Sequence, residues 1–85
     1  MGIRSIKEGL HYRALVDGGM LYDAECGLVH HLNATAAFVW EGCQAGEGME
    51  VLEGHFARQF SVDAAVARSD IERLIADFVE NGLLT

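Results

Sequence analysis

The sequence contains no proline and no polar low-complexity run, and these absences exclude a chain divided by linkers. Its 85 residues are too few for a second core, so we expect a single domain over residues 1–85. No apolar run approaches the roughly 18 residues that span a bilayer, and Met1–Arg4 is not followed by an apolar signal segment. We therefore expect a cytoplasmic protein with no membrane partner.

Basic residues are also scarce. The chain has 6 Lys and Arg against 13 Asp and Glu, which gives a formal net charge of −7. A negative field repels phosphate backbones, so we expect no nucleic acid partner.

Cysteine is limited to Cys26 and Cys43, which lack the paired spacing of a zinc ribbon or a redox motif. No nucleophile elbow or glycine-rich phosphate loop is present either. Thr35 comes two residues after a helix-capping asparagine and is typical of a helix start, not of a catalytic hydroxyl. The sequence therefore predicts a protein that is not an enzyme.

The four histidines do not have the spacing of metal ligands. His30 and His31 are adjacent in a predicted strand, so their side chains point to opposite faces. His11 and His55 fall on other elements. We expect no metal site and no cofactor, because ligands of one ion must converge.

Strand patterns come first in the chain and helix patterns follow. Alternating residues and turn glycines predict strands at 9–15, 20–22 and 28–32. Apolar residues at three- and four-residue spacings predict helices at 33–44, 49–59 and from 61 or 63 to 82. Segregated strands and helices indicate an α+β class, here a three-stranded antiparallel sheet followed by three helices in a winged helix-turn-helix-like arrangement.

The strand at 28–32 is the candidate binding element. Leu28, His30 and Leu32 share one face, which we expect on the core, and Val29 and His31 share the other. In a meander this strand lies at an edge with unpaired N–H and C=O groups, and it carries no Asp, Glu, Lys, Arg or proline to shield them. A peptide could add there as a fourth strand. The alternatives are that the N-terminal segment covers this edge, or that the edge is too short to bind anything.

Several motifs together resemble the PqqD-like family, the RiPP recognition elements. They are Leu21-Tyr22-Asp23, the run Gly27 to Asn33, Ala34-Thr35-Ala36-Ala37, Trp40-Glu41 and Gly82-Leu83-Leu84. The resemblance implies a non-catalytic module that binds the leader of a ribosomally made precursor peptide and presents it to a modifying enzyme or protease. It leaves the pathway open between lasso peptides, a quinone cofactor and others.

The resemblance also implies a site between the third strand and the last helix. The strand residues are Leu28, Val29, His30, His31 and Leu32. On the helix, one border of the apolar stripe holds Arg68, Glu72, Ile75 and Val79, and the other holds Asp70, Arg73, Leu74 and Asp77. We favour the first border.

Two other functions fit the same pattern. A winged-helix DNA-binding or transcription-associated protein needs a basic recognition helix, whereas residues 63–80 hold more acidic than basic residues. A structural subunit could instead hold an enzyme through an apolar patch. An exposed sheet edge also makes a homodimer possible.

Overall fold

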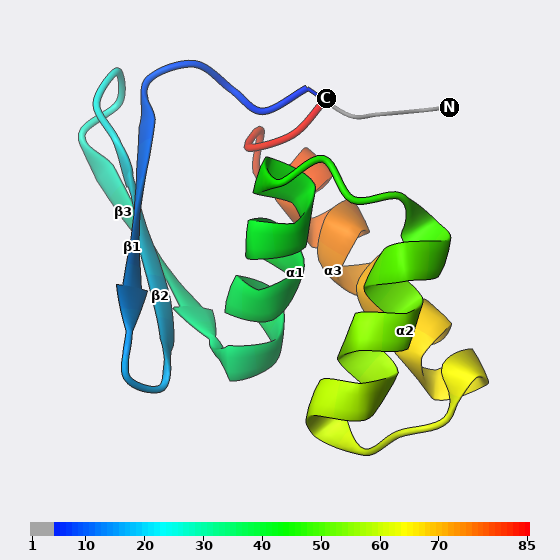
Figure 1. The fold of residues 1–85 in the computed structure, drawn as a ribbon. Helices are drawn as coiled ribbons and strands as arrows, with labels where there is room; N and C mark the ends of the chain where they lie inside the picture. The colour runs from blue at the N-terminus through cyan, green and yellow to red at the C-terminus, as the bar shows by residue number, and fades with distance from the viewer. Residues whose placement is uncertain (1–4) are drawn as a thin grey trace.

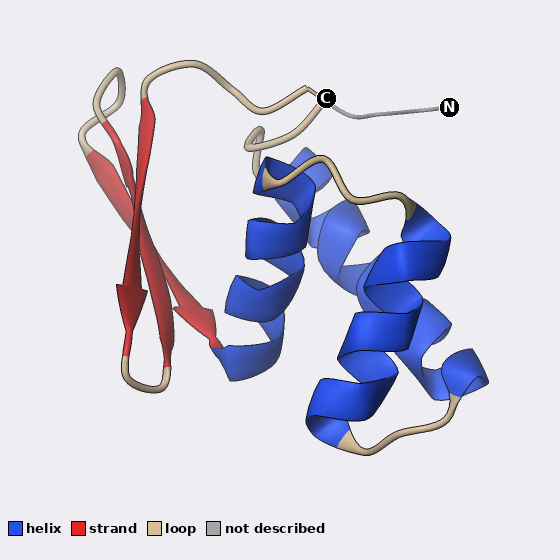
Figure 2. Cartoon of the chain, viewed as in Figure 1, coloured by secondary structure: helices blue, strands red, loops and turns tan. Residues whose placement is uncertain are grey.

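The computed structural model describes residues 5–85 and has three strands followed by three helices (Figure 1). The elements are β1 (Leu10–Leu15), β2 (Gly18–Asp23), β3 (Leu28–Asn33), α1 (Ala34–Gln44), α2 (Met49–Phe60) and α3 (Ala64–Glu80). All three helices lie on one side of the sheet (Figure 2). The predicted α+β class and element order are therefore confirmed. Met1–Arg4, for which the sequence predicts no signal segment, lies outside the described residues.

The sheet is an antiparallel meander in the order β1-β2-β3. A two-residue turn closes the first hairpin at the pair Leu15 and Gly18, and the second hairpin closes at Asp23 and Leu28. Gly27 takes the left-handed conformation expected of it there, with φ 71°. Both β1 and β3 are consequently edge strands.

Side-chain caps fix where two of the helices begin. The Asn33 side-chain oxygen accepts a hydrogen bond of 2.9 Å from the amide of Ala36, and Asp63 does the same for Val66 at 2.9 Å. These bonds satisfy amides that have no partner inside the helix. Gly48 precedes α2 without a side-chain cap, yet the helix begins at Met49 as its apolar spacing predicts.

The core lies between the sheet and the helices, with α1 at its centre. Its largest fully buried side chains are Trp40, Phe56, Leu21, Ile71 and Val39. The Trp40 ring meets the ring of Phe78 on α3 edge to face, with centroids 5.2 Å apart. This contact fastens α3 to the helix that covers the sheet.

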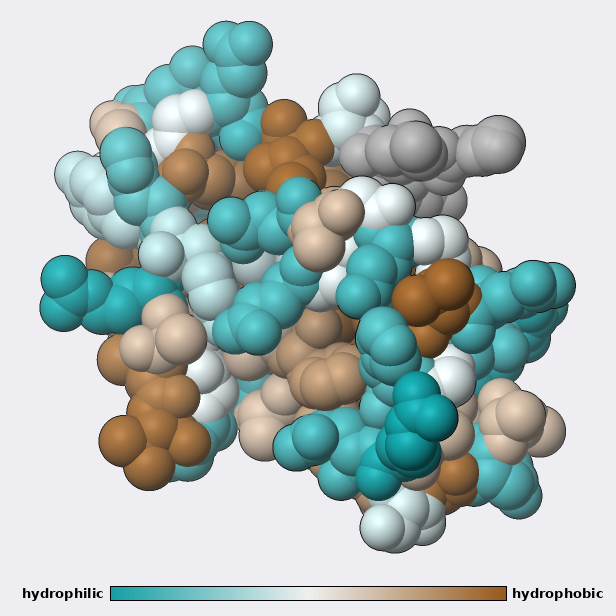
Figure 3. All heavy atoms as spheres, viewed as in Figure 1, coloured by the Kyte–Doolittle hydropathy of each residue, from teal (hydrophilic) through white to brown (hydrophobic). Residues whose placement is uncertain are grey.

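Two side chains that helical spacing places near the buried side of α2 are exposed. Val51 is 52% exposed, and His55 lies outside the core with its Nδ1 3.4 Å from a Glu47 oxygen. Only Leu52 and Phe56 of α2 are buried, and Met49, Ala57 and Phe60 are partly buried against the core. On the face drawn in Figure 3, hydrophobic groups lie among hydrophilic ones.

The two ends of the described chain pair with each other. Ile6 forms an antiparallel bridge with Leu84, and the Lys7 amide donates to the Leu83 carbonyl at 3.0 Å. Residues 5–7 therefore lie against the C-terminal segment. They do not cover the edge of β3, as the alternative prediction for the N-terminal segment required. None of the helices within residues 5–85 is long and apolar enough to cross a membrane.

Candidate functional site

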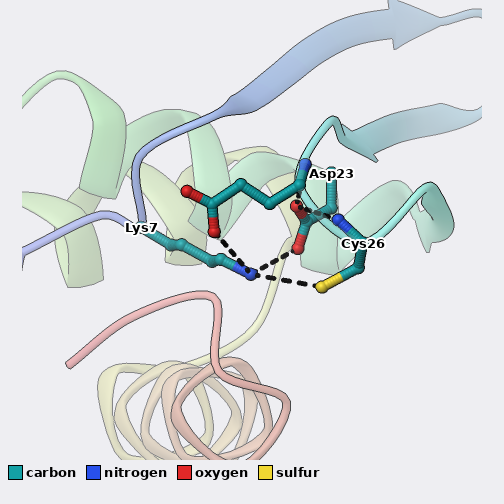
Figure 4. A network of polar contacts seen from close by, with 4 residues as sticks. Lys7, Asp23 and Cys26 are labelled. Atoms are coloured by element: carbon teal, nitrogen blue, oxygen red, sulfur yellow. Dashed lines mark hydrogen bonds and ion pairs between the residues drawn. The ribbon is translucent and has the colours of Figure 1, made fainter.

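A partly buried ion pair lies next to the turn that leads into β3 (Figure 4). Asp23 is 3% exposed, and its side chain accepts from Lys7 Nζ at 2.6 Å and from the amides of Glu25 and Cys26 at 3.0 and 3.2 Å. The Lys7 hydrogen bond, helped by the two amides, lowers the pKa of Asp23 to about 2 against the opposing effect of burial. The β2–β3 turn is thus tied to the N-terminal segment.

The backbone of β3 has free groups along one edge. The amide of Ala24 donates to the carbonyl of Gly9 at 3.0 Å, which continues the β1–β2 ladder beyond Asp23. Successive residues of a central antiparallel strand bond to opposite neighbours, so even-numbered residues of β2 bond to β1 and odd-numbered residues bond to β3. The odd residues pair with Leu28, His30 and Leu32 of β3.

It follows that Val29 and His31 direct their N–H and C=O groups away from β2. Within residues 5–85, β3 has no second neighbouring strand, so nothing continues the sheet at these positions. Each of the two residues offers one donor and one acceptor to an incoming strand. The predicted free edge is therefore present.

The inward face of β3 is only partly covered. His30 pairs with the buried Leu21, which places Leu28, His30 and Leu32 on the helix side of the sheet. Leu32 packs against the core and His30 is half-buried, but Leu28 is 55% exposed. The prediction that this face lies on the core is wrong for Leu28, because α1 begins at the other end of β3.

The favoured border of α3 lies beside α2. The Arg68 guanidinium forms an ion pair with the Glu53 carboxylate of α2. Ile75 and Val79 on the same side are partly buried against the core, and Glu72 is exposed. These four residues therefore share the side of α3 that faces α2.

The other border of α3 faces away from α2. With about 3.6 residues per turn, Asp77 lies on the opposite side of the helix from Arg68. Asp70 and Leu74 lie on the same side as Asp77, and Leu74 is buried, with 8% of its surface exposed. The Asp70 carboxylate forms an ion pair with Arg73, with Nη2 3.6 Å from the carboxylate oxygen. This border therefore carries two carboxylates and the Arg73 guanidinium beside one apolar side chain.

The position of α3 relative to the two edge strands follows from how α1 lies on the sheet. The hydroxyl of Tyr12 on β1 donates a hydrogen bond to the Glu41 carboxylate of α1 at 2.6 Å. The side of α1 that carries Glu41 therefore faces β1. In Figure 1 β1 passes in front of the other strands while α3 lies behind α1. In this view α3 lies on the same side of α1 as β3, and its Asp77 border is the one directed away from α2.

A shallow pocket on the β1 side of α1 offers no catalytic pair. It is a hollow of about 320 Å³ lined by Tyr12, Glu41, Gln44 and Ala45. Burial, with the Glu41 hydrogen bond, raises the pKa of Tyr12 to about 12, so its hydroxyl stays protonated. Residues 5–85 contain no group of three or more His, Cys, Asp and Glu side chains placed to hold a metal ion.

Comparison with known proteins identifies one family and one fold. Residues 18–84 match the family described as Coenzyme PQQ synthesis protein D (PqqD). The solved structure of a lasso peptide synthetase B1 complexed with the leader peptide is 21% identical, with a TM-score of 0.87 over 99% of each chain. TbiB1 in complex with the TbiA(beta) leader peptide is 19% identical, with a TM-score of 0.83 over 94% of this chain and 93% of that one. No curated protein matches the sequence.

Proposed function

This chain belongs to the PqqD family, and we propose that it is a non-catalytic module that captures the leader of a ribosomally synthesised precursor peptide. The observation that carries the proposal is the free backbone edge of β3 at Val29 and His31. Support comes from the two structural neighbours, both of which were solved with a leader peptide. The leader adds to β3 as a fourth strand and gains its affinity from main-chain hydrogen bonds.

The strand side of the proposed site is Leu28 to Leu32, as the sequence predicts. Val29 and His31 supply backbone groups, while Leu28 and His30 direct side chains toward the helices. The exposed part of Leu28 is available to an apolar side chain of the leader.

For the helix side we propose the border with Asp70, Leu74 and Asp77. The favoured set of Arg68, Glu72, Ile75 and Val79 stays a prediction, but the Arg68–Glu53 ion pair weighs against it because it sets that border against α2. Asp70 is paired with Arg73, but Asp77 forms no ion pair within residues 5–85 and fits a leader that carries a basic side chain next to apolar ones, since opposite charges across an interface favour correct docking.

The proposed module works with a second protein. Nothing in the site supplies a nucleophile, so the bound precursor is presented to a peptide-modifying enzyme or protease of the same pathway in the cytoplasm. A homodimer formed edge to edge through β3 would use the same backbone groups, so the leader would dissociate it. Carboxylates on the exposed side of α3 oppose the alternative of a DNA-reading helix.

The test is a titration of the isotope-labelled protein with a synthetic leader, taken from the precursor gene next to the gene of this chain. Amide resonances of Leu28 to Leu32 and of the Asp77 border should move. If no leader binds, the function is wrong. If the leader binds but these resonances stay still, the site is wrong.

A matched pair of charge reversals separates the two borders of α3. Asp77→Lys should weaken binding of a leader with a basic side chain, whereas Glu72→Lys should leave it unchanged. Both carboxylates are exposed, so neither change should affect folding. The reverse result would restore the Arg68 border.

A further inference from the structure

No helix or strand of residues 5–85 covers the side of the sheet that is turned away from the helices. We call this side the outer sheet face. Register and strand alternation place two rows of three side chains on it: His11, Tyr22 and Val29, and Arg13, Met20 and His31. All helices lie on the opposite side of the sheet, as Figure 2 shows.

Apolar and aromatic groups lie at the middle of this face. Tyr22 is 42% exposed and Val29 is 50% exposed, and Met20 lies beside them at the centre of the sheet. The ring of His11 lies 6.3 Å from that of Tyr22. Here Met20 is half-buried and Tyr22 is exposed, and Tyr, Met and Arg are residue types that are enriched in protein interfaces.

The charge on the outer sheet face is opposite to that of the rest of the protein. The chain has a net charge of −7, yet none of the side chains that the strand register places on this face is a carboxylate. Arg13 forms no ion pair within the described residues, whereas Lys7, Arg68 and Arg73 each do. The face is therefore complementary to an apolar surface bordered by carboxylates.

The face is also continuous with the proposed leader site. Val29 and His31 carry side chains on the outer sheet face while their backbone groups point to the free edge of β3. A leader added at that edge would become the fourth strand, and every second side chain of the leader would extend the same face. A protein seated there would contact this chain and the bound peptide together.

We propose that the outer sheet face docks the enzyme that processes the bound precursor, through an apolar patch on the enzyme bordered by Asp and Glu. This inference rests on the proposed leader binding. A symmetric second copy fits less well, because it would bring the Arg13 side chains of two molecules to one interface. The bound leader and the docked enzyme use different groups, so both can be present at once.

The experiment measures binding of the purified processing enzyme, encoded beside the precursor gene, to the preformed complex of this protein with its synthetic leader. Arg13→Glu and Tyr22→Ser change side chains of the outer sheet face and substitute no residue of β3. Each should weaken enzyme binding about tenfold or more, as expected for Arg and Tyr anchors. Affinity for the leader should stay the same in both variants.

The matched control is Arg58→Glu, which makes the same charge change at an exposed residue of α2. It should leave both affinities unchanged. Enzyme binding that is equal in Arg13→Glu, Tyr22→Ser and the unaltered protein would overturn the docking proposal, as would an unaltered complex that fails to bind the enzyme. Loss of leader affinity in both outer-face variants would overturn the separation of the two surfaces. Failure of the leader to bind the unaltered protein would instead overturn the proposed function.

Discussion

A proline at Val29 should block peptide binding while leaving the fold intact. The amide of Val29 points away from β2, so its loss removes no hydrogen bond from the existing sheet. Proline is tolerated on edge strands for this reason. The proline therefore removes a hydrogen bond to the incoming leader strand and none to β2.

The size of the effect follows from the groups that are lost. One backbone hydrogen bond contributes about 0.5–1.5 kcal/mol, and the proline ring also obstructs the neighbouring bond to the peptide. A total loss of about 1–2 kcal/mol corresponds to a Kd roughly 5- to 30-fold weaker. Calorimetric titration of Val29→Pro with the synthetic leader measures this ratio directly.

Two controls separate the backbone effect from other causes. Val29→Thr changes the side chain but keeps the amide, so it should bind nearly as well as the unaltered protein. Ala14→Pro places proline on the other edge of the sheet, where the same alternation leaves the amide of Ala14 unpaired. If Val29→Pro binds the leader as tightly as Ala14→Pro, strand addition to β3 is wrong.

Three further predictions concern stability. Asn33→Ala removes the cap of α1 and should lower the free energy of unfolding by about 1 kcal/mol in urea titrations; an unchanged value would show that the cap contributes nothing. Ile71→Ala leaves a cavity at a fully buried site and should lower the free energy of unfolding by about 2–5 kcal/mol in the same titration. A much smaller decrease would mean that α3 packs more loosely than described. Because the folded pKa of Asp23 is lowered to about 2, its stabilising effect is complete above its ordinary pKa of 3.8 and is lost as the pH falls toward 2. The melting temperature should drop over that range, and less so in Asp23→Asn; equal drops would assign the acid sensitivity to other groups.

The fold was largely predictable because local signals agreed with the tertiary structure. The side chains of Asn33 and Asp63 form caps wherever a helix follows them, and Gly82 adopts the left-handed φ of 76° that ends α3. The exposure of Val51 was not predictable in this way. Helical spacing gives the apolar side of α2 but not how much of that side its neighbours cover.

The site was predictable on its strand side and ambiguous on its helix side. Alternation alone placed Val29 and His31 opposite Leu28 and Leu32, and the pairing with β2 then showed which amides remain free. The apolar stripe of α3 has two borders of similar composition, so only a contact from another element distinguishes them. The pairing of Arg68 with Glu53 on α2 is such a contact, and no spacing within α3 predicts it.

Hydrogen exchange with and without the leader tests the central claim most directly. In the free protein the amides of Val29 and His31 should exchange quickly, whereas those of His30 and Leu32 are protected by their bonds to β2. Leader binding by strand addition should slow exchange at Val29 and His31 in particular. If the leader binds and these two amides still exchange as fast as in the free protein, the leader does not add to β3 as a strand.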